Sequence, residues 1–467
     1  MLAAVAIFCI AAVYMGSHQA RGSQVAVGMP DGVYDLPPQL PNHLGIGVTA
    51  DLGRQGLGGW VPQTRVPFDY VYQYLAGGVN TGAGWQTWDR GAAFPLVYAD
   101  EAKAQHHLPV FSYYMIEQSK SACRCGEAQG DLTRLNDRSI MATYFEDFRT
   151  LMERLGPGTW NGVKGFGGTV IVQVEPDLSG YAEQAVLDPG SCYGFCTGRG
   201  NDPSLLKAAV GDSGIAQVKQ FPDTYLGFNQ ALLHLRDVYA PDVLLAFHES
   251  AWSTRQDIGS NTNPDLDVTR LGQQAGSFAA LSGVRSTMHG LSTYNLVFTD
   301  ISDRDASVTG DWWDPTNRNL PDFVQWEQYI GSGARVFRKP VFVWQVPLGN
   351  QWFDTENGSY GHTQDNRIEY FFAHPRQLID AGIAAVLYGA GNAGSTTIGD
   401  TDGDGVTNPS PTCHTLHGTT TCANHKSSYA DDDGGYLRVW AGRYYRHPLS
   451  LSRAKQAPSA SANTSTS

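Results

Sequence analysis

Eight short apolar segments, rich in β-branched and aromatic residues, recur along the chain. Runs of this length and composition are typical of strands that are buried on both faces of a sheet. Several of the gaps between them are long enough to hold a helix. The segments are Leu44–Ala50, Tyr70–Leu75, Pro109–Ile116, Thr169–Glu175, Val243–Glu249, Asn295–Asp300, Pro340–Val346 and Gly382–Tyr388.

Amphipathic segments with helical spacing lie between several of these runs. One extends from Met141 to Leu155 with Asn136 as its expected N-cap, and another extends from Tyr225 to Val238. Further helices are expected at Val97–His107, Leu266–Leu281, Asp322–Ile330, Arg367–Ala381 and Tyr436–Tyr445. Alternating strands and helices favour a parallel sheet, and eight strands favour a closed (β/α)8 barrel of the TIM type. The alternative, an open doubly wound sheet, lacks support because no glycine-rich phosphate loop follows the first strand.

The fourth apolar run ends in Glu175-Pro176-Asp177, which is the most informative stretch of the chain. Proline cannot extend a strand ladder, so both carboxylates are expected at the C-terminal end of a strand. In barrel enzymes that rim carries the active site. The structural alternative is that Asp177 caps the next segment and Glu175 forms a salt bridge at the rim.

Polar and aromatic residues also end most of the other predicted strands. Aromatic rings can stack on sugar rings, while acids and amides can bind hydroxyl groups. The mixture is therefore typical of a sugar-binding site. The candidate ligand-binding residues are Asp51, Tyr113, Tyr114, His248, Trp252, Asp300, Trp344, Gln345 and Tyr388.

Hydrolysis of a glycosidic bond needs two carboxyl groups, one acting as acid and one as base or nucleophile. Glu175 is the first candidate for the acid, and Glu249 on the next strand is the first candidate for the base. Asp177 and Asp300 are the substitutes. We therefore expect Glu175 and Glu249 to face one common hollow. The chemistry needs no catalytic cofactor, and the amide Gln345 at the end of strand seven slightly favours inversion of the anomeric centre.

Composition agrees with one large globular unit that binds a neutral ligand. The chain has 467 residues, of which 42% are hydrophobic and 11% aromatic, enough for a sizeable core. Its net charge is −13, without a basic cluster. This balance disfavours nucleic acid and anionic membranes as partners and leaves a neutral polysaccharide or oligosaccharide as the expected substrate.

The N-terminus and the cysteines predict export. Residues 1–20 contain the apolar run Leu2–Tyr14, which is too short to span a bilayer and predicts a signal peptide or, alternatively, a signal anchor. Six cysteines follow, an even number that favours three disulfides in an oxidising compartment. Cys413 and Cys422 form the favoured pair because they close a short loop. The alternatives of mutual cross-linking and zinc binding apply to Cys123, Cys125, Cys192 and Cys196.

The segment after the eighth strand has carboxylates at every second position, as calcium-binding loops do. It predicts a structural Ca²⁺ held by Asp400, Asp402 and Asp404, although position twelve is Pro411 rather than a glutamate. The alternative is a solvated acidic turn. Residues 40–448 are expected to form one (β/α)8 domain with long loops on the C-terminal face. The tail, residues 449–467, is rich in Ser, Ala and Thr and is expected to be disordered.

The strand ending Glu175-Pro176-Asp177, together with His248 and the nearby Trp252, resembles features of glycoside hydrolase family 6. That family cleaves β-1,4-glucan with inversion and uses as its acid an Asp after an earlier strand. The corresponding stretch here, Phe111–Ile116, contains no Asp. The resemblance implies a barrel hydrolase that acts on a polysaccharide, with a different acid.

The position of Glu175 also resembles that of the acid/base glutamate in retaining barrel glycosidases. Their usual preceding Asn is replaced by Val174, and Gln345 stands where their nucleophile Glu lies. The sequence therefore predicts a secreted glycoside hydrolase. The alternatives are a catalytically inactive barrel that binds glycans or scaffolds an assembly, and a metal-dependent esterase or deacetylase, which would need a cluster of His and Asp ligands.

Overall fold

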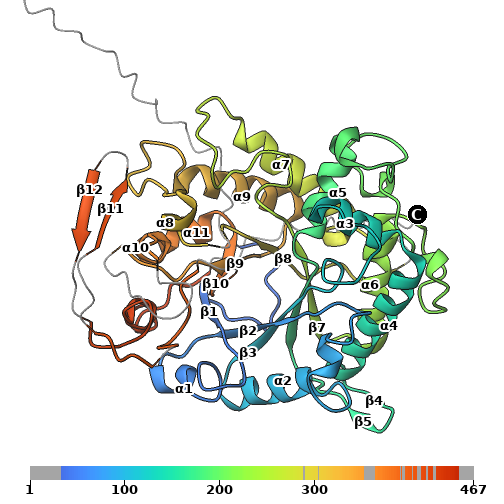
Figure 1. Ribbon diagram of the computed structural model, residues 1–467, viewed down its shortest axis with the longest axis horizontal. Helices are drawn as coiled ribbons and strands as arrows, with labels where there is room; N and C mark the ends of the chain where they lie inside the picture. Colours follow the sequence, from blue (N-terminus) through green and yellow to red (C-terminus); the bar gives the residue numbers. More distant parts are fainter. Residues whose placement is uncertain are drawn as a thin grey trace, which may run out of the picture.

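A closed parallel barrel forms the centre of the molecule (Figure 1), with its strands in the order β1-β10-β9-β8-β7-β6-β3-β2. The computed structural model describes residues 33–451 except 288–289, 303, 352–362, 390, 392–394, 402, 408–411, 417–418 and 424–426. The predicted (β/α)8 fold is confirmed, and each predicted strand corresponds to one barrel strand. These strands are β1 (Gly45–Thr49), β2 (Tyr70–Leu75), β3 (Leu108–Tyr113), β6 (Val170–Val174), β7 (Val243–His248), β8 (Leu296–Thr299), β9 (Val341–Val346) and β10 (Ile383–Tyr388).

Helices surround the barrel and shield the outer faces of its strands (Figure 1). The predicted helices correspond to α2, α4, α6, α7, α9 and α12. The predicted helix 367–381 is split into α10 and α11, because Pro375 disfavours helical geometry at the residue before it. Neither α3 nor α5 was predicted. The longer helices are α2 (Phe94–Ala104), α3 (Glu127–Leu135), α4 (Arg138–Leu155), α5 (Leu178–Leu187), α6 (Tyr225–Tyr239), α7 (Val268–Ala279), α9 (Phe323–Phe337), α10 (Arg367–Ala373), α11 (Pro375–Asp380) and α12 (Tyr436–Tyr444).

The short elements lie in the connections. They include the helices α1 (Trp60–Thr64) and α8 (Ala306–Thr309) and two hairpins, β4 (Thr159–Trp160) with β5 (Val163–Lys164) and β11 (Thr412–Leu416) with β12 (Thr419–Ala423). The second hairpin lies at the edge of the molecule (Figure 1). None of these elements contributes a strand to the barrel.

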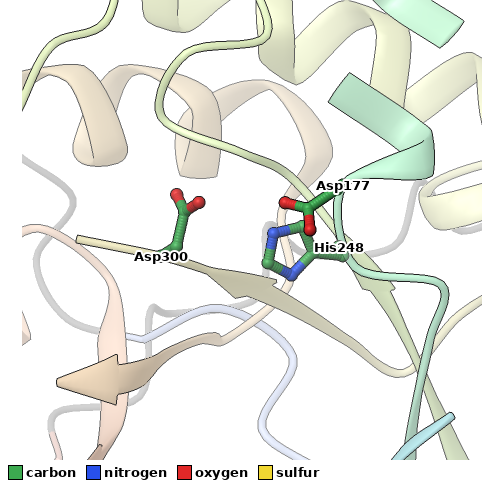
Figure 2. A group of neighbouring side chains, drawn as sticks. All are labelled: Asp177, His248 and Asp300. Atoms are coloured by element: carbon green, nitrogen blue, oxygen red, sulfur yellow. The ribbon is translucent and has the colours of Figure 1, made fainter. Parts of the chain in front are cut away.

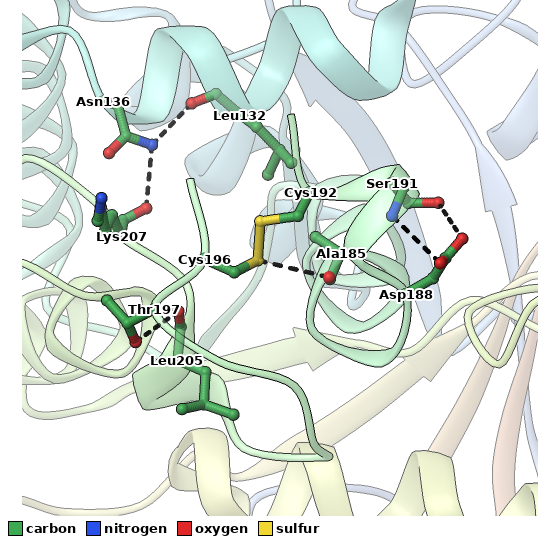
Figure 3. Close-up of a disulfide and its surroundings, with 11 residues drawn as sticks. Leu132, Asn136, Ala185, Asp188, Ser191, Cys192, Cys196, Thr197, Leu205 and Lys207 are labelled. Carbon is green, nitrogen blue, oxygen red and sulfur yellow. Dashed lines mark hydrogen bonds between the residues drawn. A yellow bond between two sulfur atoms is a disulfide. The ribbon is translucent and has the colours of Figure 1, made fainter. Parts of the chain in front are cut away.

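The N-terminus of α4 begins one residue later than predicted. The side chain of Asp137 accepts hydrogen bonds from two backbone N–H groups of the first turn and is the N-cap. Asn136 instead donates from its side-chain amide to the carbonyl oxygens of Leu132 and Lys207 (Figure 3). It therefore ties the end of α3 to the long loop that follows α5.

Side chains inside the barrel form an apolar layer and a polar layer, because alternate residues of each strand point inward. In the apolar layer, the ring of Phe342 packs against those of Tyr70 and Phe298 at centroid distances of 5.1 and 5.3 Å. The polar layer lies nearer the C-terminal ends of the strands and consists of Ser112, Gln173 and His248, which are joined by hydrogen bonds.

Two disulfides lie in the loops that follow β3 and β6. They join Cys123 to Cys125 and Cys192 to Cys196, the latter shown in Figure 3. The alternative of a zinc site at these cysteines is therefore wrong. Cys413 and Cys422 are cross-strand partners in the β11–β12 hairpin. Their side chains lie outside the described part of the chain, so a disulfide between them stays a prediction.

The proposed calcium loop closes on its own backbone. The carboxylate of Asp400 accepts hydrogen bonds from the N–H groups of Asp404 and Gly405, and that of Asp404 accepts one from Val406. Asp402 lies outside the described residues. A structural Ca²⁺ bound by this loop stays a prediction.

The predicted signal peptide and most of the predicted tail lie outside the described residues. Within residues 33–451, as far as they are described, no helix combines the length and the apolar character needed to cross a bilayer. The barrel begins at Gly45 and its last strand ends at Tyr388.

Candidate active site

A pocket of about 760 Å³ opens at the C-terminal ends of the barrel strands. Volumes of this size are usual for small-ligand sites. The walls combine aromatic rings with carboxylates. The rings are Tyr74, Tyr114, Tyr181, Trp252 and Trp344, and the carboxylates are Glu127, Asp177, Asp257, Asp300 and Asp311.

Three side chains from consecutive barrel strands converge here: Asp177 and Asp300 line the pocket, and His248 is buried next to them. Asp177 follows β6, His248 ends β7 and Asp300 follows β8. Figure 2 shows the imidazole beside the Asp177 carboxylate, with the Asp300 carboxylate across from both. One oxygen from each aspartate and one ring nitrogen lie within 4.8 Å of one another. The structure thus brings together the two carboxylates that the sequence offered only as substitutes.

Glu175 does not line the pocket. Its buried carboxylate, 3% exposed, accepts hydrogen bonds of 3.1–3.2 Å from the N–H groups of Met115 and Ile116 and lies beside Tyr144 of α4. Strand alternation from Gln173 would place Glu175 inside the barrel. A φ of 43° at Glu175 breaks that alternation and turns the side chain outward. The expectation that Glu175 faces the pocket is wrong.

We expect the substitution Glu175→Gln to keep kcat within about tenfold of the original value. Burial raises the pKa of Glu175 to about 8, so at pH 7 the carboxyl is mostly protonated and the amide replaces a neutral group of the same shape. Steady-state kinetics on the best substrate measure the effect. A loss of roughly 10²–10⁴-fold, the size expected for a lost proton transfer, would return Glu175 to the mechanism.

Glu249 also points away from the pocket. Consecutive residues of a strand face opposite sides, so the inward position of His248 directs Glu249 outward. Its carboxylate accepts a 2.5 Å hydrogen bond from Ser253 and lies beside the carboxyl of Glu183 on α5. The neighbouring walls belong to α7 and α9. Glu175 and Glu249 therefore do not face a common hollow, and that expectation is also wrong.

The buried Glu183 and Glu249 pair should make stability depend on pH. Burial raises the pKa of Glu183 to about 7, and burial together with repulsion from Glu183 raises the pKa of Glu249 well above its ordinary value. Because the folded-state pKa values are raised, this contribution is complete below about pH 4.5 and is lost as the pH rises through 7. We expect the urea midpoint to fall between about pH 5 and 8, and to fall less in Glu249→Gln. Equal pH slopes in both proteins would contradict this.

Four of the other predicted ligand-binding residues line the pocket, namely Tyr114, Trp252, Trp344 and Gln345. Three do not. The ring of Tyr113 follows the inward Ser112, so it points outward and donates its hydroxyl to Asp147 on α4. Tyr388 also points outward, where its ring stacks on that of Phe372 on α10. Asp51 is exposed and accepts a hydrogen bond from its own loop. The placements predicted for these three residues are wrong.

Four of the five aromatic rings of the pocket are held as two pairs. Tyr181 and Trp252 pack with centroids 4.8 Å apart, and Tyr74 and Trp344 with centroids 5.6 Å apart. Gln345 donates a hydrogen bond to the hydroxyl of Tyr74. The pairs provide surfaces on which the apolar face of a sugar ring can stack.

Strained backbone accompanies two of the polar pocket residues. Asp177 has a φ of 72° and Gln345 has a φ of 56°. Such conformations cost about 1–3 kcal/mol each for residues other than glycine and cluster at functional sites. Asp177 directly follows Pro176, and its unusual φ lets its side chain point in a different direction from that of Glu175.

Asp300 is suited to hold a proton near neutral pH. Burial raises the pKa of Asp300 to about 6, and repulsion from Asp257 acts in the same direction. A 2.9 Å hydrogen bond from the N–H of Ala251 opposes the shift. A carboxyl with this pKa can deliver a proton to a leaving group in mildly acidic solution.

Several pocket residues escaped the sequence analysis. Tyr181 and Glu127 lie on α5 and α3, the helices that the apolar spacing did not predict. Gln173 does not line the pocket; it lies inside the buried strand Val170–Val174 and contacts His248. A signal for Gln173 was present, because an amide within an apolar run must find hydrogen-bond partners.

Comparisons with known proteins do not assign the site. No protein-family model matches the chain, and no curated protein matches it. Among solved structures, a GH10 protein from Paenibacillus barcinonensis is 12% identical, with 87% of this chain and 97% of that chain covered and a TM-score of 0.39. An endo-β-1,4-mannanase from Cellulomonas fimi is 11% identical, with coverage of 76% and 67% and a TM-score of 0.40. Similarity this low carries no functional argument, so the site is judged on its own geometry.

Proposed function

We propose that the protein hydrolyses glycosidic bonds of a polysaccharide or oligosaccharide, with Asp300 as general acid and Asp177 as nucleophile. The supporting observation is that an oxygen of each carboxylate lies within 4.8 Å of the other at a pocket walled by aromatic rings. Two carboxyl groups at such a separation, with stacking surfaces beside them, are the minimal equipment for this reaction.

Retention of the anomeric configuration is part of the proposal, because the nearest oxygens of the two carboxylates lie within 4.8 Å. Carboxyl groups lie about 5–5.5 Å apart in retaining glycosidases and about 6.5–9.5 Å apart in inverting ones, which must leave room for a water. In the proposed course, Asp177 forms a bond to the anomeric carbon as the bond to the leaving oxygen breaks, and Asp300 gives its proton to that oxygen. Water then cleaves the glycosyl ester and returns a proton to Asp300. The proposal departs here from the inversion that Gln345 slightly favours, and that inversion stays a prediction.

Export of the protein is part of the proposal. The disulfides Cys123–Cys125 and Cys192–Cys196 support it, because such bonds persist mainly in oxidising compartments. A substrate of polysaccharide size would be met there.

The test is release of reducing ends from a panel of soluble and insoluble polysaccharides, with the Asp177→Asn protein as the matched blank. We expect at least one glycan to be cleaved by the original protein and not by the variant. Binding of a glycan by both proteins, with no cleavage by either, would favour the alternative of a catalytically inactive glycan-binding barrel.

A metal-dependent esterase or deacetylase is the second candidate. Asp177, His248 and Asp300 form the kind of His and Asp cluster that such an enzyme requires. Metal binding needs a free lone pair on the imidazole nitrogen that faces the carboxylates. The hydrogen bond from Gln173 to Nδ1 of His248 argues against that lone pair, because it favours a proton on the other ring nitrogen.

A further inference from the structure

A chain of hydrogen bonds within the barrel ends at His248. Ser112 donates from its hydroxyl to Oε1 of Gln173 at 2.9 Å, and Nε2 of Gln173 lies 2.6 Å from Nδ1 of His248. In this orientation of the amide, Nε2 of Gln173 donates and Nδ1 of His248 accepts with its lone pair. In a neutral imidazole the proton is then on the other nitrogen, Nε2.

Burial and the hydrogen bond from Gln173 both favour a neutral imidazole at His248. It is 1% exposed, and burial lowers its pKa to about 3. Its Nε2–H group has no hydrogen-bond partner among the described residues. A buried donor without a partner costs about 1–3 kcal/mol, and this cost is recovered when an acceptor arrives.

The facing atoms of His248, Asp177 and Asp300 lie close enough together for one oxygen atom to contact all three groups. The centre of a triangle with sides of 4.8 Å, the upper limit for the three facing atoms, lies about 2.8 Å from each corner. An oxygen placed there is within hydrogen-bond distance of all three groups. A hydroxyl can accept from Nε2–H and donate its own hydrogen to a carboxylate.

We propose that His248, held as the Nε2–H tautomer by Ser112 and Gln173, donates a hydrogen bond to a substrate hydroxyl that lies beside Asp177 and Asp300. The inference rests on the proposed function for the identity of the hydroxyl, and His248 becomes a specificity-determining residue of that site. Gln173 is a positioning residue, because it acts through the ring. A substrate analogue without this hydroxyl leaves the buried donor unpaired, and sites of this kind reject such analogues strongly.

The Nε2–H tautomer disfavours a divalent metal at the same place. Zinc takes nitrogen ligands at about 2.0–2.1 Å through a lone pair, and Nε2 with a proton has none. The substitution Gln173→Glu should favour metal binding, because a carboxylate there accepts a hydrogen bond from Nδ1–H and leaves the lone pair of Nε2 free. Pairs of carboxylate and imidazole are the usual support of zinc-binding histidines.

The experiment is nitrogen NMR of the full chain labelled with ¹⁵N-histidine, first without ligand, then with ZnCl₂, and then with glucose, mannose, galactose and xylose in turn. We expect a directly bonded proton on Nε2 of His248, no response to zinc, and a shift of the Nε2–H signal with at least one sugar. Assignment uses His248→Gln.

Three outcomes overturn the inference. A proton on Nδ1 contradicts the tautomer, a response of the imidazole to zinc in the original protein favours the metal site, and no response to any of the sugars removes the hydroxyl site. Zinc binding gained by Gln173→Glu supports the assignment independently. The tautomer is read without turnover, so failure of the hydrolase assay and failure of this inference are distinguishable.

Discussion

Replacement of Asp177 by asparagine is expected to lower kcat by roughly 10⁴-fold or more, the scale on which loss of a covalent nucleophile acts. Asparagine has nearly the same shape but cannot form the glycosyl ester. Asp177 lies at the pocket within 4.8 Å of Asp300, with its direction set by a strained backbone turn. Sugar binding, measured by calorimetry, should change little because the aromatic walls are untouched.

The matched control for this prediction is Asp311→Asn, the same substitution at a carboxylate that also lines the pocket but lies outside the proposed catalytic group. We expect it to retain kcat within about tenfold. If Asp177→Asn and Asp311→Asn lose activity equally, the loss reflects the charge of the pocket rather than covalent catalysis, and the nucleophile assignment fails.

Replacement of Asp300 by asparagine is expected to lower kcat by roughly 10²–10⁴-fold, the usual contribution of general acid catalysis. The pH profile should identify the role. Because burial and Asp257 raise the pKa of Asp300 to about 6, the original protein holds the required proton below that pH and loses it above. Activity should therefore decline as the pH rises through 6, and this decline should be missing in Asp300→Asn.

A leaving group that needs no proton supplies the control for Asp300. Nitrophenyl glycosides depart as stable phenolates, so Asp300→Asn should impair their cleavage far less than that of a natural glycan. The measurement is kcat/KM for both substrate types in both proteins. An equal loss on both would assign Asp300 to binding, and an unchanged pH profile in the variant would remove it as the titrating acid.

The pairing of catalytic carboxylates illustrates what strand alternation can and cannot reveal. His248 and Glu249 are adjacent in one strand, so only one of them can face the interior. That rule was available from the sequence and would have directed Glu249 toward the helices. It would have failed for Glu175, because the φ of 43° there is not implied by the letters Glu-Pro-Asp.

The amino-acid pattern was enough to predict the barrel, its strands and the rim on which Asp177, Asp300, Trp252 and Trp344 lie. Apolar runs and helical spacing are local properties of the sequence, so they can be recognised without knowing which residues are in contact in the fold. Which carboxylates of the rim lie close together became evident only from the folded chain. The direction of a side chain beyond a strand end depends on backbone turns and on the helices packed outside, as Tyr144 beside Glu175 and Ser253 bonded to Glu249 show. Tyr144 is distant from Glu175 in the sequence, and the contact of Ser253 with Glu249 depends on the turn that follows the strand. Neither contact is encoded by a local pattern of apolar residues.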